Sequence, residues 1–270
     1  MEVALTVEIN GGRIYTSVAM RSRPGVVVLV YLFLVAAAEV VTTLVHPIVG
    51  ILFHSGLLAA LVIHAAVLDD HGMRRLLLPL TLAPLTRILS LSMPLTILPQ
   101  IFWYPIIYLP LAVGTIVVMR QVGLSRKDVG LTLNRPLVQA LLFPVGALLG
   151  LTEYMILRPG PLESQLTVVA VSVSTLVLFA TTGLVEEWVF RGVLQKVMGD
   201  RFGWLGLIYT SALFAVLHLG FLSLLDLGFV FAVAVLFAWV VKSTGSLLGV
   251  TLAHGLTNIS LYVILPLLLR

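Results

Sequence analysis

Three short stretches of this sequence place ionisable or amide side chains at helical spacing inside otherwise apolar runs. They contain, in chain order, Glu186, Glu187 and Arg191, then Phe214 and His218, then His254 and Asn258. An ionisable side chain inside a membrane-spanning helix is costly and by default marks a functional site. Together the three stretches predict a hydrolytic site inside a membrane.

The two adjacent glutamates are expected to play different parts. Neighbouring residues on a helix point about 100° apart, so the two carboxylates cannot serve one point equally. Arg191 follows Glu187 by four residues, which favours an ion pair between them. Glu186 is then free to face a cavity as a general base. The alternative for this motif alone is a solvated helix end at the membrane interface.

The two histidine motifs add groups that can move or donate protons. His218 can hold a water molecule or shuttle a proton, and Phe214 lies one turn earlier on the same face as a cavity wall. The alternative for His218 is a bond to a neighbouring backbone carbonyl. His254 and Asn258 share a helix face and can donate hydrogen bonds to an oxyanion, or else hydrogen-bond between helices. Gly249 and Gly255 would let another helix pack closely.

Several other chemistries lack their signatures. The chain has no cysteine, which excludes disulfides and thiol catalysis, and it lacks the His-Glu-x-x-His zinc motif. A metal site of Glu186, His218 and His254 is chemically conceivable, but nothing in the spacing demands it. We expect no metal and no cofactor. A Gly-x-Ser-x-Gly motif, a phosphate-binding loop and a nucleic-acid module are also missing.

Composition predicts an integral membrane protein. The chain is 60% hydrophobic and 10% charged, with a mean hydropathy of +1.12. Repeated apolar runs of about 20 residues are what a bilayer requires, and such runs predict an all-α, multi-pass bundle of about eight or nine transmembrane helices. The net charge is +4, but the basic residues lie in loops, which indicates anionic lipid headgroups rather than nucleic acid.

The chain divides into four predicted segments. Residues 1–24 form a surface segment, read as a small hairpin around Asn10-Gly11-Gly12 or as a docked or disordered tail. Residues 25–119 hold N-terminal transmembrane helices, 120–136 are a polar basic linker, and 137–270 form the catalytic bundle. Spans are expected at 25–45, 48–68, 76–119 (two, interrupted by prolines), 137–157, 166–198, 203–222, 225–241 and 246–267.

Polar residues in the N-terminal half need partners. Arg87 requires a counter-charge or a nearby interface, and Glu39 is predicted to cluster with His46 and His54. With the basic loops on the cytoplasmic side and nine spans, Glu186 would lie toward the cytoplasm and His218 nearer the opposite face. The two can meet only if the span ends differ or one proline-rich segment does not cross. The end of the 166–198 run is expected to project past the hydrocarbon.

The ordered motifs Glu186-Glu187-x-x-x-Arg191, Phe214-x-x-x-His218 and His254-x-x-x-Asn258 resemble the CAAX prenyl endopeptidase and bacteriocin-processing (CPBP, Abi) family of intramembrane proteases. The resemblance covers roughly residues 137–270. It implies a glutamate-type, metal-independent mechanism in which Glu186 activates water with His218 as its partner. It also implies that His254 and Asn258 form an oxyanion hole.

Two functions follow as hypotheses. The first is an intramembrane endopeptidase acting on a membrane-anchored peptide, for example the prenylated C-terminal tail of a CAAX protein, with lipid as the surrounding partner. The second is a non-enzymatic protein of bacteriocin immunity or transport that uses the same polar cluster for binding or proton transfer.

Overall fold

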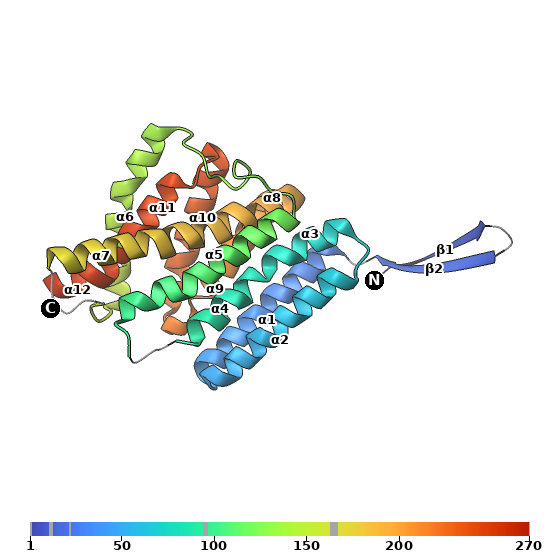
Figure 1. Ribbon diagram of the computed structural model, residues 1–270, viewed down its shortest axis with the longest axis horizontal. Helices are drawn as coiled ribbons and strands as arrows, with labels where there is room; N and C mark the ends of the chain where they lie inside the picture. Colours follow the sequence, from blue (N-terminus) through green and yellow to red (C-terminus); the bar gives the residue numbers. More distant parts are fainter. Residues whose placement is uncertain (1, 11–12, 22, 94–96, 163–166, 270) are drawn as a thin grey trace.

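The computed structural model describes residues 2–10, 13–21, 23–93, 97–162 and 167–269. Strands β1 (Glu2–Asn10) and β2 (Arg13–Arg21) pair antiparallel, with Glu2 opposite Arg21 and Asn10 opposite Arg13. This hairpin extends away from the helices in Figure 1. It agrees with the hairpin predicted for the first segment, although Gly11 and Gly12 of the predicted turn lie outside the described residues.

The rest of the described chain is helical, which confirms the predicted fold class. The N-terminal helices are α1 (Pro24–Leu44), α2 (Pro47–Val67), α3 (His71–Leu80), α4 (Leu82–Leu91), η1 (Gln100–Phe102) and α5 (Trp103–Gln121). The C-terminal helices are α6 (Pro136–Leu157), α7 (Val168–Leu178), η2 (Phe179–Glu186), η3 (Trp188–Leu194), α8 (Gln195–Phe202), α9 (Trp204–Val216), η4 (Leu219–Phe221), α10 (Leu224–Thr244), α11 (Leu248–Ile259), η5 (Ser260–Ile264) and α12 (Leu265–Leu268).

Proline sets many of the helix boundaries. Pro24, Pro47 and Pro136 occupy the first turns of α1, α2 and α6, where a missing N–H costs nothing. Pro84 lacks the N–H that would bond the carbonyl of residue 80, and its ring would collide with that carbonyl. The chain accordingly breaks at Thr81, between α3 and α4.

Eight helices of the described chain are long and apolar enough to cross a membrane. They confirm the expectation of a multi-pass membrane protein and the count of about eight or nine spans. α3 and α4 have 10 residues each, about half of what a bilayer requires. The 76–119 region thus contributes one helix that is long enough by itself, residues 100–121. Since α3 and α4 follow one another along α2 in Figure 1, the count of nine spans used to place Glu186 and His218 stays a prediction.

The helix from Val168 to Phe202 explains how Glu186 and His218 come to the same depth. It runs for 35 residues through α7, η2, η3 and α8, and Glu186 lies 16 residues before its end, roughly 24 Å at helical rise. His218 follows Trp204, the start of α9, by 14 residues, or roughly 21 Å. Glu187 and Arg191 are buried inside the protein, so this part of the run is not solvated, while the expectation that its end projects past the hydrocarbon stays a prediction.

The basic segments gather at one end of the bundle, as the sequence predicted. Arg75 forms an ion pair with Asp200 at 3.2 Å, which joins the start of α3 to the end of α8. Gly25, at the start of α1, faces Phe202, and Lys127 of the 122–135 connection lines a cavity with Asp200. These contacts define the basic end of the bundle.

Glycine allows α6 and α11 to pack backbone against backbone. A Cβ on Gly146 would collide with the carbonyl of Ala253, and one on Gly150 would lie 2.7 Å from the carbonyl oxygen of Thr257. Small residues give this close approach in membranes, where lipid supplies no hydrophobic drive between helices. The same holds for Gly249 against α6 and Gly255 against the Phe179 ring, which confirms the close packing predicted for both glycines.

A buried ionic cluster joins three N-terminal helices. Both carboxylate oxygens of Glu39 on α1 accept from Arg87 on α4, at 2.5 and 2.8 Å. His54 Nε2 on α2 lies 3.0 Å from Glu39 Oε1, without the alignment of a hydrogen bond. His46 instead caps α2 by accepting from Ile48 N–H at 3.2 Å, so the predicted cluster holds Glu39 and His54 but takes Arg87 in place of His46.

Candidate active site

Glu187 and Arg191 form a fully buried pair at the back of the site. Arg191 Nη1 donates to Glu187 Oε1 at 3.0 Å, and the exposed fractions of the two side chains are 2% and 0%. The guanidinium lies 4.2 Å from the ring centroid of Phe214, which adds a cation–π contact. The predicted ion pair and the predicted wall residue are both in place, and the interfacial alternative for this motif is wrong.

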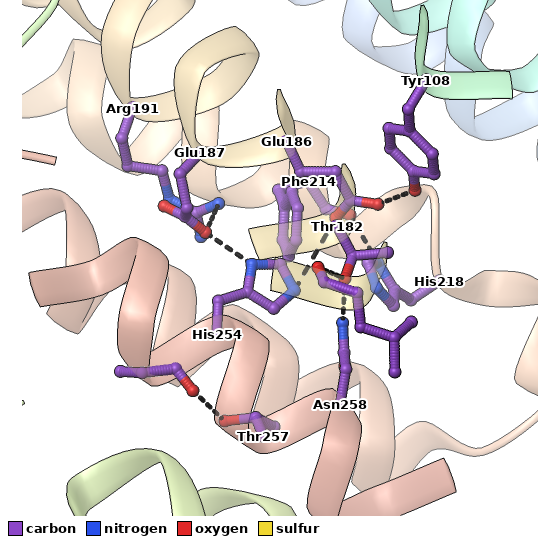
Figure 2. A network of polar contacts seen from close by, with 12 residues as sticks. Tyr108, Thr182, Glu186, Glu187, Arg191, Phe214, His218, His254, Thr257 and Asn258 are labelled. Carbon is purple, nitrogen blue, oxygen red and sulfur yellow. Dashed lines mark hydrogen bonds and ion pairs between the residues drawn. The ribbon is translucent and has the colours of Figure 1, made fainter. Parts of the chain in front are cut away.

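His254 is hydrogen-bonded to the carboxylate of Glu187. Its Nδ1 lies 2.7 Å from Glu187 Oε1, as Figure 2 shows. Because that carboxylate is already paired with Arg191, it acts as an acceptor and Nδ1 carries the proton. The other ring nitrogen, Nε2, is 3.8 Å from Glu186 Oε2, beyond hydrogen-bond range. Nε2 therefore faces the cavity, and it can donate there when the ring is an imidazolium.

Glu186 is held from the N-terminal half of the chain. The hydroxyl of Tyr108 on α5 donates to Glu186 Oε1, which leaves Oε2 turned toward His254. Glu186 ends η2, and η3 begins two residues later; both have π-helical geometry. Wide turns of this kind are frequent at functional sites because they re-aim side chains.

His218 presents one nitrogen to the cavity. Its Nδ1 lies 3.0 Å from the backbone oxygen of Phe214, the carbonyl bond weighed as the alternative for this residue. A carbonyl oxygen only accepts, so Nδ1 is the protonated nitrogen and Nε2 of the neutral ring is an acceptor. The ring also lies 4.8 Å from the Phe214 ring, centroid to centroid. The carbonyl bond thus fixes the tautomer that a proton acceptor requires.

Asn258 belongs to a hydrogen-bond chain between two helices. Its Nδ2 donates to Thr182 Oγ1 at 2.9 Å, and that hydroxyl donates in turn to the Leu178 carbonyl at 2.9 Å. This is the interhelical bond named as the alternative for the motif. An amide nitrogen has a second N–H, so the bond to Thr182 still leaves a donor.

All seven predicted site residues line one cavity of about 200 Å³ inside the bundle. Its other walls are mainly aromatic and aliphatic: Tyr104, Tyr108, Phe221, Phe229, Val230, Val233, Phe237 and Tyr262. Three further polar residues, Glu153, Thr182 and Thr257, complete the lining. In the part of the chain that the structure describes, no group of three or more His, Asp or Glu side chains is placed to hold a metal ion.

The sequence did not identify Tyr108, Thr182 or Glu153 as site residues. Tyr108 is one of several aromatic residues in a proline-rich apolar run, and it lies 78 residues from Glu186. Glu153 stands alone as an acid near the end of the predicted 137–157 span. It is near the end of α6, but its side chain is buried and faces the cavity. The presence of a carboxylate on an apolar span was the sequence signal that could have identified Glu153 as a site residue.

The helices and this cavity define a class of multi-pass integral membrane protein with a polar site enclosed in its bundle. Residues 168–260 match the family model described as type II CAAX prenyl endopeptidase Rce1-like. No curated protein and no solved structure matches the chain. The matched segment contains all three motifs, and this match supports the resemblance to the CAAX-type membrane protease family.

Proposed function

We propose that the protein is an intramembrane endopeptidase of the glutamate type. The observation that carries this proposal is the meeting of Glu186, His218, His254 and Asn258, from three separate helical segments, in one cavity. A polar cluster inside lipid is costly and by default marks a functional site. The family match supports proteolysis as the activity.

In the proposed reaction, water lies between Glu186 and His218. Glu186 Oε2 takes one proton from the water while Nε2 of His218 accepts the hydrogen bond of the other. The oxygen then bonds to the peptide carbonyl carbon. Glu186 returns the proton to the leaving amine as the C–N bond breaks, so the carboxylate is regenerated and one water is consumed for each bond cleaved.

The negative charge of the tetrahedral intermediate needs donors. The free N–H of Asn258 and protonated Nε2 of His254 supply two, and Glu187 keeps the His254 ring oriented. Donors fixed before the reaction stabilise an oxyanion without reorganisation. Arg191 pairs with the same carboxylate oxygen of Glu187 and so completes the support of this ring.

The cavity walls support a substrate with an apolar anchor. Phe221, Phe229, Val233 and Phe237 line the same space as the polar groups, so a lipid-modified peptide can leave its anchor in apolar surroundings while its scissile bond meets Glu186. A prenylated CAAX tail has this chemistry and is our proposed substrate class.

The test is cleavage of a farnesylated CAAX peptide by purified protein in detergent, with Glu186→Gln beside the natural chain. We expect cleavage by the natural protein and loss of at least about 10³-fold in the variant, since it lacks the base. Glu153→Gln is the matched control, because Glu153 is a buried acid of the same cavity outside the proposed mechanism. Cleavage that survives in Glu186→Gln would refute the assignment, and no cleavage by any variant would favour the immunity or transport alternative.

A further inference from the structure

A second cavity, of about 290 Å³, lies at the basic end of the bundle beside the candidate active site. Its lining includes Lys127, Arg191, Gln195, Lys196, Gly199 and Lys242. Lys127 and Lys242 are exposed, so this cavity reaches the polar surface. Arg191 lines both cavities and marks the place where they approach each other.

A stripe of polar side chains connects the two cavities along one helix face. Glu187, Arg191 and Gln195 follow at intervals of four residues, and Gly199 continues the series. Residues four apart lie about one turn apart on the same helix face, so the three side chains form one continuous row. The three side chains are buried. Gly199, which has no side chain, lines the second cavity at the end of the stripe.

Two acceptors on this stripe have no protein partner among the described residues. They are Glu187 Oε2 and Gln195 Oε1, both buried. Buried oxygen acceptors are nearly always hydrogen-bonded, to protein or to ordered water. Lipid cannot supply such a bond, whereas water reaching the second cavity from the surface can.

We propose that the stripe Glu187–Arg191–Gln195 is a hydrated path that brings water from the basic end of the bundle to the cavity of Glu186. The path rests on the proposed function in one respect, namely that hydrolysis consumes the water it delivers. Its charged and amide groups can hold a file of water molecules that an apolar helix face would exclude. The water then reaches the site from the polar end and does not cross the lipid that surrounds the apolar walls.

Because the chain has no cysteine, single cysteines can report on this path directly. Gln195→Cys is treated with 2-sulfonatoethyl methanethiosulfonate, a small anionic thiol reagent, beside Leu194→Cys. Leu194 is the neighbouring residue, also buried but packed in the apolar core. We expect Gln195→Cys to react at least about tenfold faster, because thiol modification requires access and an ionisable environment.

A blocking variant tests whether reagent arrives through the second cavity. Gly199→Met in the Gln195→Cys background adds a flexible side chain at the cavity lining and should slow labelling at least about fivefold, by restricting access. Gly228→Met is the control, since a Cβ there meets no atom within 4 Å. Thermal unfolding in detergent identifies variants that lose the fold.

Equal labelling of the Gln195→Cys and Leu194→Cys variants, or no labelling of either, would overturn the proposal, as would labelling unaffected by Gly199→Met. The readout does not depend on peptide cleavage and can be repeated in the Glu186→Gln background. A failed path is therefore distinguishable from a failed assignment of the protease.

Discussion

Replacing Tyr108 by phenylalanine tests how much the N-terminal half contributes to the site. The variant keeps the buried ring and removes only the hydroxyl that donates to Glu186 Oε1. A hydrogen bond to a charged group is worth about 1.5–3 kcal/mol, equivalent to roughly a 10- to 150-fold change in rate if the whole of it serves the transition state. We expect kcat/KM to fall at least about tenfold, mainly through kcat, because the freed carboxylate can rotate away from the water.

The assay is cleavage of the farnesylated peptide over a range of concentrations, with Tyr104→Phe as the matched control. Tyr104 lies one turn earlier on α5, lines the same cavity, and its ring centroid is 6.4 Å from that of Tyr108. Loss of a hydroxyl from this cavity is thus common to both variants, and the bond to Glu186 is specific to Tyr108. Full activity in Tyr108→Phe, or equal losses in the two variants, would refute this reasoning.

Three further predictions concern stability and ionisation. Glu187→Gln should lower the free energy of unfolding by about 3–5 kcal/mol, since it leaves the Arg191 guanidinium buried without its counter-charge. Asp200→Asn, at the partly exposed pair with Arg75, should lower it by under about 1 kcal/mol. Thermal unfolding in detergent compares the two variants. Gly146→Val should separate α6 from α11, because its Cβ meets the Ala253 carbonyl, and so lower both melting temperature and cleavage, while Gly228→Val changes neither. Hydrogen bonds from Ser125 hold the pKa of the Asp128 carboxyl below its usual value. Their stabilising effect is therefore complete above the pKa of Asp128 in the unfolded chain and is lost as pH falls through its pKa in the folded chain. Ser125→Ala should raise the pKa of Asp128 in an NMR titration, and an unchanged pKa would contradict this role of Ser125.

Contacts within one helix were predictable from the sequence. The spacing of Glu187 and Arg191 at four residues leads directly to their ion pair, and Pro24, Pro47 and Pro136 mark helix starts to within one residue of the predicted spans. These features depend on local geometry, which a single sequence contains. The three site motifs could be recognised in the sequence for the same reason, since each of them lies within one helical stretch.

Contacts between helices were not predictable in the same way. Tyr108 bonds Glu186 across 78 positions, and Asn258 bonds Thr182 across 76. In a soluble protein the apolar face of a helix indicates which side is buried. Here lipid-facing and buried sides are equally apolar, so the rotation of each helix, and hence its partners, leaves almost no trace in the hydrophobic pattern. The shared depth of Glu186 and His218 was missed because it depends on the full length of the Val168–Phe202 helix.

The Glu39–Arg87 pair has a consequence for how the chain is built in the membrane. Glu39 enters the bilayer with α1, and its partner Arg87 is synthesised 48 residues later. During that interval the α1–α2 hairpin carries a carboxylate whose cost at a bilayer centre is roughly 2.5–3.5 kcal/mol, with His54 beside it. Until α4 docks, the nascent hairpin therefore holds a carboxylate inside the membrane without the arginine that pairs with it in the folded chain.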